Sequence, residues 1–123
     1  MEYSVLMTVY EKDNPEYFRK ALMSMVKQTK KADEIVVVKD GPITRELQSV
    51  LDDIDKKNPN LIVQVQLPVN KGLGLALNEG IKVCKNELLA RMDADDISLP
   101  TRCEKQVEQF ENNPDLDIIG CPV

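Results

Sequence analysis

The feature of this sequence that most constrains its fold is a regular alternation of short apolar runs with amphipathic helical segments. Apolar runs at 3–9, 35–38, 61–67 and 87–92 are typical of buried strands, and a fifth run begins at 116. Strands that are apolar almost throughout and alternate with helices indicate parallel pairing, with helices on both faces of the sheet. We therefore predict a Rossmann-like parallel-sheet α/β/α sandwich, with residues 1–123 forming a single domain. Because the fifth strand has barely begun at 123, we expect a truncated fold, the N-terminal fragment of a longer protein.

Four helices are predicted between these strands. The first begins where a capping side chain precedes Pro15, and it continues to Lys27. The second ends at 58–60, the third follows the loop at 68–74, and the fourth begins at Pro100. The apolar residues at helical spacing are, in chain order, Phe18, Ala21, Leu22, Met25, Val26, Leu47, Val50, Leu51, Ile54, Leu75, Leu77, Ile81, Val83, Val107 and Phe110.

Composition excludes several classes of function. A net charge of −5 argues against a general nucleic-acid binder, which needs clustered Lys and Arg to neutralise phosphates. Histidine is absent, so acid–base chemistry and metal binding would depend on other side chains. The three cysteines are scattered, as in a reducing compartment, and no apolar run approaches the ~20 residues of a membrane span. We expect a cytoplasmic protein without a transmembrane segment, which a partner or further segment could bring to the inner face of a membrane.

An acidic cluster follows the fourth predicted strand: Asp93, Asp95 and Asp96, with Ala94 between the first two. Like charges this close repel one another, so the arrangement favours a bound cation, and Mg²⁺ is commonly held between carboxylates and substrate phosphates. A solvated acidic turn is the alternative. The spacing does not continue as a calcium-binding loop, and Leu77 stands where a dinucleotide-binding glycine motif would need its last glycine.

Polar residues follow every predicted strand. The strands lead into 8–11, 39–41, 70–72 and 93–96, and in an open parallel sheet these carboxyl ends share one edge, where ligands bind. Tyr10 could stack on a base or simply pack at this edge, and Asp40 could bind a ligand or cap the turn before Gly41. The convergence predicts a binding site at this edge more strongly than any single motif does.

Taken together, these segments resemble the family 2 glycosyltransferases, inverting enzymes with the glycosyltransferase A-type fold. The resemblance covers essentially the whole chain in order. Its motifs are the opening strand at 5–10, the S-x-x-x-Q-T helix end at 24–29, the strand and acidic turn at 34–41, the N-x-G and L-N-x-G segment at 70–80, and the D-x-D strand and following helix at 90–106.

The resemblance implies roles for individual residues in binding a nucleotide diphosphate sugar, with a UDP-sugar favoured. Thr8 and Tyr10 would line the nucleobase pocket, and Asp40 would accept a hydrogen bond from the base. Asn70 and Lys71 would lie in the loop near the nucleotide.

The acidic cluster would complete this site. Asp93 would approach the ribose or the metal shell, Asp95 would coordinate Mg²⁺ or Mn²⁺ bridging the diphosphate, and Asp96 would support that site. A metal there would neutralise charge as the diphosphate leaves. The acceptor would be a hydroxyl of a glycan or lipid-linked molecule, and polysaccharide or cell-surface glycan synthesis is the function that the family suggests.

Two departures and one gap accompany the resemblance. Lys39 stands where the family often has a second Asp, and Glu11 stands where Asn is common, so either could alter nucleotide preference. No residue is assigned as the catalytic base, which is expected beyond Val123, so this chain alone is expected not to transfer sugar. A non-catalytic nucleotide-binding module remains an alternative, since fold alone does not determine function. A sugar nucleotidyltransferase is a second alternative, although the glycine-rich, basic loop typical of that class is missing at 8–14.

Overall fold

The structure, a computed structural model, describes residues 2–94, 101, 103–105, 107 and 108. Its elements are, in chain order, β1 (Ser4–Val9), α1 (Pro15–Val26), β2 (Glu34–Lys39), α2 (Arg45–Lys57), β3 (Ile62–Gln66), α3 (Leu73–Val83) and β4 (Leu89–Met92). This order confirms the predicted alternation through β4. Residues 103–105, 107 and 108 are also helical, as predicted, whereas Phe110 and the predicted fifth strand lie outside the described residues.

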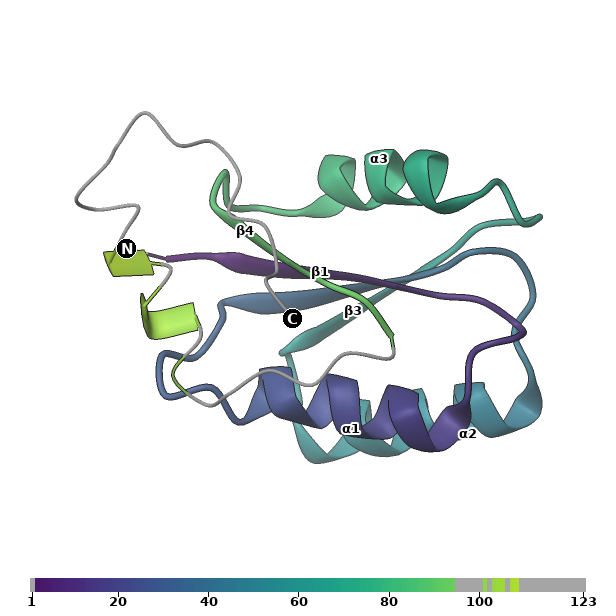
Figure 1. Cartoon of the computed structure of the whole chain (residues 1–123), viewed down its shortest axis with the longest axis horizontal. Coiled ribbons are helices and arrows are strands. Elements are labelled where there is room, and N and C mark those ends of the chain that lie inside the picture. The colour runs from purple at the N-terminus through teal and green to yellow at the C-terminus, as the bar shows by residue number, and fades with distance from the viewer. Residues whose placement is uncertain (1, 95–100, 102, 106, 109–123) are drawn as a thin grey trace.

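The described strands form one parallel sheet in the order β3-β2-β1-β4. The chain moves from β1 outward to β3 and then returns to place β4 on the other side of β1. Figure 1 shows α1 and α2 on one face of the sheet and α3 on the other. Because parallel crossovers keep one hand, the reversal of direction after β3 moves the connecting helix to the opposite face. The order of strands therefore reverses between β1 and β4, where α/β sheets bind ligands.

Local capping determines where the first two helices begin. Asn14 Oδ1 accepts hydrogen bonds from the backbone N–H groups of Glu16 and Tyr17, at 2.9 and 3.1 Å, which confirms the predicted start before Pro15. Thr44 Oγ1 accepts from the Leu47 N–H at 3.2 Å at the start of α2. These caps satisfy backbone donors that have no partner within a helix.

The two faces of the sheet are covered differently. The larger core lies between the sheet and the helices α1 and α2, whose apolar faces are buried as predicted. On the other face, Ala76 and Gly80 of α3 are buried against the sheet and Leu77 packs partly buried against the same cluster, while Leu75, Ile81 and Val83 are exposed. The apolar pattern thus located α3 correctly and included Leu77, but it did not indicate that the small residues Ala76 and Gly80 make the closest contact with the sheet.

Candidate functional site

A pocket of about 320 Å³ lies at the carboxyl edge of the sheet, where the strand order reverses. Its size is at the lower end of the range typical of small-molecule sites. The lining residues are Thr8, Val9, Tyr10, Asp13, Asp40, Asn70, Gly72, Leu73, Asp93 and Ala94. The structure therefore brings five of the six predicted nucleotide-binding residues together from four separate parts of the chain, and only Lys71 is missing from the lining.

Asp40 is the most buried acidic residue of this pocket, with 6% of its surface exposed. Its Oδ1 atom accepts a hydrogen bond from the backbone N–H of Lys71 at 2.7 Å. Within the described part of the chain, Oδ2 has no hydrogen-bond partner. Buried polar atoms are nearly always hydrogen-bonded. A buried carboxylate oxygen without a partner at the wall of a pocket is suited to accept a hydrogen bond from a ligand.

Next to Asp40, the loop after β2 and the loop after β3 approach each other closely. Gly41 has φ +85°, and a Cβ atom there would lie 2.6 Å from the backbone nitrogen of Asn70. Only glycine allows both this conformation and this contact. Asn70 in turn accepts a hydrogen bond from the Gly72 N–H at 3.1 Å, which holds the turn before α3. The sequence therefore places a glycine where the β2 and β3 loops meet to form the pocket wall.

The β1 end of the pocket contains a turn that sequence reasoning did not assign to the site. Asp13 lines the pocket, and its Oδ2 atom accepts a hydrogen bond from the Tyr10 N–H at 2.9 Å. Tyr10 is 39% exposed, so part of its ring is accessible at the pocket. Its place in the loop after β1 is the sequence signal for Asp13, but polar residues just before Pro15 also suit the start of a helix, which is the only role that the sequence analysis gives to this stretch.

Of the acidic cluster, Asp93 lies on the pocket wall, and Asp95 and Asp96 lie outside the described residues. Asp93 is half-exposed and forms an ion pair with Arg91 at 3.6 Å. No group of three metal-ligating side chains occurs among the residues described. The described wall carries the carboxylates of Asp13, Asp40 and Asp93 and neither Lys nor Arg, so oxygen donors suited to Mg²⁺ or Mn²⁺ predominate there.

The two departures from the family pattern do not line this pocket. Lys39 is buried with 9% exposed, and its Nζ atom donates to Gln48 Oε1 and Gln64 Oε1 at 3.2 and 3.1 Å. Successive side chains of a strand point to opposite faces. Lys39 therefore points toward α2, while Asp40 binds the loop on the pocket side. Glu11 is exposed.

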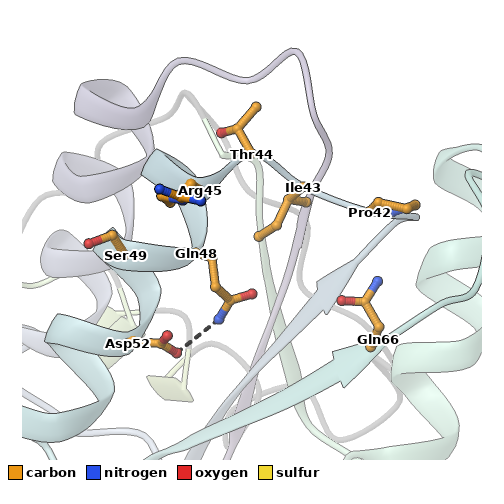
Figure 2. A pocket seen from close by; sticks show the side chains of 8 residues that line it. All are labelled: Pro42, Ile43, Thr44, Arg45, Gln48, Ser49, Asp52 and Gln66. Atoms are coloured by element: carbon orange, nitrogen blue, oxygen red, sulfur yellow. Dashed lines mark hydrogen bonds between the residues drawn. The ribbon is translucent and has the colours of Figure 1, made fainter.

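A second pocket, of about 500 Å³, lies between the start of α2 and the end of β3 (Figure 2). Its walls come from 42–45, Gln48, Ser49, Asp52 and Gln66. Gln48 Nε2 donates to Asp52 Oδ1 at 2.8 Å, and Gln66 donates to two backbone carbonyls. None of the predicted site residues that the structure describes lines it, and Gln48, Asp52 and Gln66 already bind one another or the backbone. The smaller pocket is therefore the candidate site.

Comparison with known proteins agrees with this fold. The family model described as "Glycosyl transferase family 2" matches residues 4–123, and the chain belongs to this family. An uncharacterized glycosyltransferase of Haemophilus influenzae is 47% identical over 120 residues, 98% of this chain and 44% of that protein. The amylovoran biosynthesis glycosyltransferase AmsE of Erwinia amylovora is 43% identical over 98% of this chain and 45% of its own length. The chain thus spans less than half the length of these relatives.

A third relative has a defined reaction in its name. It is the UDP-Gal:alpha-D-GlcNAc-diphosphoundecaprenol beta-1,3-galactosyltransferase of Escherichia coli, 39% identical over 97% of this chain and 42% of its own length.

Solved structures confirm the fold as that of the glycosyltransferase A-type enzymes. S. aureus TarS 1-349 in complex with UDP has a TM-score of 0.75 and 26% identity, over 93% of this chain and 33% of that one. The mannosyltransferase PcManGT of Pyrobaculum calidifontis, in complex with GDP-Man and Mn²⁺, has a TM-score of 0.77 over 89% of this chain and 32% of its own, at 19% identity. No described helix is long and apolar enough to cross a membrane.

Proposed function

We propose that this chain binds the nucleotide of a UDP-sugar, and that the protein to which it belongs transfers the sugar to an acceptor hydroxyl with inversion. The acceptor is a glycan or lipid-linked molecule in polysaccharide or cell-surface glycan synthesis. The single observation that carries the proposal is the pocket at the strand-order reversal, with a buried Asp40 oxygen available to a ligand. The E. coli relative is named for the donor UDP-Gal, and TarS has been solved with UDP and with UDP-GlcNAc.

The geometry around Asp40 favours uracil over guanine. One carboxylate oxygen is already engaged by the Lys71 N–H, which leaves Oδ2 as the oxygen without a partner among the described residues. Uracil presents one ring N–H to such an acceptor, whereas guanine presents two donors side by side. Tyr10 is partly exposed at the same pocket and offers an aromatic face to the base.

The charge of the pocket supports a metal-dependent mode of binding. The described wall is acidic and carries no basic side chain, so a diphosphate would be repelled without a cation. We propose that Asp95 holds Mg²⁺ or Mn²⁺, with Asp93 and Asp96 beside it. When bound, such an ion would neutralise the charge that develops on the leaving diphosphate. We place the catalytic base outside this chain, which would therefore bind donor without transferring sugar.

Calorimetric titration tests this proposal. UDP, GDP and dTDP are titrated into the protein with and without Mn²⁺, and UDP is expected to bind best, with Mn²⁺ tightening it about tenfold or more. Asp95→Ala should abolish the Mn²⁺-dependent part and leave metal-free binding unchanged. The matched control is Asp53→Ala, which removes a half-exposed carboxylate on α2 that pairs with Arg19 and Lys57.

Three outcomes would each contradict part of the proposal. If UDP does not bind, the pocket is not a nucleotide site. If Asp95→Ala and Asp53→Ala retain the same Mn²⁺ dependence, Asp95 is not the metal ligand. Transfer of sugar to an added acceptor by this chain alone would show that the catalytic base has been placed wrongly.

A further inference from the structure

The last residue of β3 is a glutamine whose amide binds the backbone of two loops. Gln66 Nε2 donates to the Gly41 carbonyl at 2.9 Å and to the Leu67 carbonyl at 2.8 Å. An amide nitrogen carries two hydrogens, so both are engaged. Figure 2 shows the Gln66 side chain extending from β3 toward the loop at Pro42. Gln66 therefore joins the loop after β2 to the loop after β3, directly beside Asp40.

The sequence explains why a side chain supplies these bonds. The backbone N–H of Leu67 donates to the Lys39 carbonyl at 3.0 Å at the end of the β2–β3 ladder. Gly41 and Leu67 are each followed by a proline, at 42 and 68. Proline has no N–H, so it cannot continue the hydrogen bonds between the two strands. Gly41 is buried, and a buried carbonyl needs a partner, which the Gln66 amide provides.

Asp40 is held in place from three sides. Its backbone N–H donates to the Val9 carbonyl at 2.8 Å, which fixes it to the end of β1. Its Oδ1 atom accepts the Lys71 N–H at 2.7 Å, which orients the carboxylate. On the third side, Gln66 holds the carbonyl of the next residue, Gly41. This third contact depends on the Gln66 side chain, so a substitution can remove it and leave the other two.

The third contact matters because of the residue that it holds. Gly41 has φ +85°, and glycine adopts more backbone conformations than any other residue. Without the Gln66 amide, the peptide after Asp40 would be free to rotate. A group that binds a ligand loses affinity when its position is not held closely, and a displacement of about 1 Å can cost on the order of a hundredfold.

We propose that Gln66 is a positioning residue for nucleobase binding, because by fixing the Gly41 carbonyl it holds Asp40 Oδ2 where the base can donate to it. The inference rests on the proposed function and adds to it a residue of β3. Gln66 does not line the smaller pocket, so it acts through Asp40 and does not touch the base.

Uridine titration tests this role. Uridine has no phosphate, so the result does not depend on a metal. Gln66→Met keeps the side-chain length and removes the amide, and we expect it to weaken uridine binding about fivefold or more.

The matched control is Gln64→Met. Gln64 lies on the same face of β3, and its Nε2 atom donates to Asp52 and Asp55 of α2 at 3.2 and 2.9 Å. Uridine affinity should stay within about twofold of the wild type in this variant. Gln64 also accepts a hydrogen bond from the buried Lys39 Nζ atom, so Gln64→Met should lower the urea midpoint at least as much as Gln66→Met does. Affinity and stability are then separated within one strand.

A double variant shows whether Gln66 acts through Asp40. In the Asp40→Asn background, Gln66→Met should weaken uridine binding by less than about a further twofold, because the carboxylate that it positions is already gone. A merely structural role would give the same loss in both backgrounds. Gln66→Glu is a second substitution in case Gln66→Met does not fold. It has the same length but no N–H to donate, so it should weaken uridine binding at least as much.

The failures of this inference and of the proposed function are distinguishable. If the folded Gln66 variants bind uridine as tightly as Gln64→Met does, Gln66 is not a positioning residue, while the proposed function stands. The same conclusion follows if the loss is undiminished in the Asp40→Asn background. A wild-type protein that binds neither uridine nor UDP would overturn the proposed function and this inference together.

Discussion

Replacing Gly80 by alanine tests how closely α3 approaches the sheet. Gly80 is buried, and an added Cβ atom would lie 2.4 Å from Leu6 Cδ1 and 2.8 Å from Val38 Cγ2. Both distances are far shorter than a normal carbon–carbon contact of about 3.5–4.0 Å. Leu6 and Val38 are themselves 3% and 0% exposed, and the branched Val38 side chain is restricted in rotation, so neither can move aside freely.

The magnitude follows from two opposing effects. Overpacking a core typically costs about 1–3 kcal/mol. Alanine in a helix interior gains up to about 1 kcal/mol over glycine. With two short contacts in a rigid setting, we expect Gly80→Ala to lower the free energy of unfolding by about 1–2 kcal/mol. Because α3 begins at the pocket, with Gly72 and Leu73 in its wall, uridine affinity should fall as well.

The helix contains its own control. Gly74 lies in the first turn of α3, and a Cβ atom there would have no neighbour within 4 Å. Gly74→Ala should therefore be neutral or stabilising by a few tenths of a kcal/mol, roughly the share of the helix preference expected near a helix end. The measurement is urea unfolding of both variants, with the midpoint and slope fitted together.

A double variant checks the cause. Leu6→Val shortens the side chain that the new methyl group would meet, so Gly80→Ala and Leu6→Val together should cost at least about 0.5 kcal/mol less than the sum of the single variants. If Gly80→Ala is as stable as Gly74→Ala, α3 does not pack against Leu6 and Val38 as described. The same conclusion follows if the stability losses of Gly80→Ala and Leu6→Val simply add in the double variant.

Three further predictions concern the pocket and a thiol. Gly41→Ala should lower the free energy of unfolding by about 2 kcal/mol or more and weaken uridine binding in titration. Gly41 has φ +85°, which disfavours alanine, and the new Cβ atom would also clash with the Asn70 backbone. Unchanged uridine affinity would contradict the close contact of the two loops. Asp40→Asn should weaken uridine binding about tenfold or more with little loss of stability in urea, because an N–H₂ group replaces the acceptor oxygen; equal affinity would remove Asp40 from the base site. Burial, with a smaller contribution from Glu34, raises the pKa of Cys84 from 9.0 to about 11, so at pH 8 iodoacetamide should alkylate it roughly a hundredfold more slowly than an unperturbed thiol. For the same reason the free energy of unfolding should fall as pH rises from about 9 to 11, because the unfolded chain loses this proton first; rapid alkylation of Cys84 itself in the folded protein at pH 8 would contradict the raised pKa.

Much of the site was predictable because it depends on where strands end. The predicted carboxyl ends of the four strands share one edge, and five of the predicted residues line one pocket there. Asp13 was missed because its residue type also suits a helix start. The expectation that Lys39 could influence nucleotide preference depended on which way its side chain points, and the structure places it between β2, β3 and α2, away from the pocket.

The order, type and approximate bounds of the described elements follow from local sequence alone, since apolar periodicity and capping act between residues that are near one another in the chain. Asn14 caps α1 as its position before Pro15 predicts. Parallel pairing and the shared binding edge follow from that order.

Which residues meet across long separations in the chain is known only from the packed fold. Gln28 caps a helix 75 residues away, Gly80 allows α3 to approach Leu6, and Gly41 contacts the Asn70 backbone. Each depends on the distance between two packed elements, which no local pattern encodes, because the same residue type is compatible with many surroundings. The order of elements is therefore a property of short stretches of sequence, whereas the shape of the pocket is a property of the packed whole.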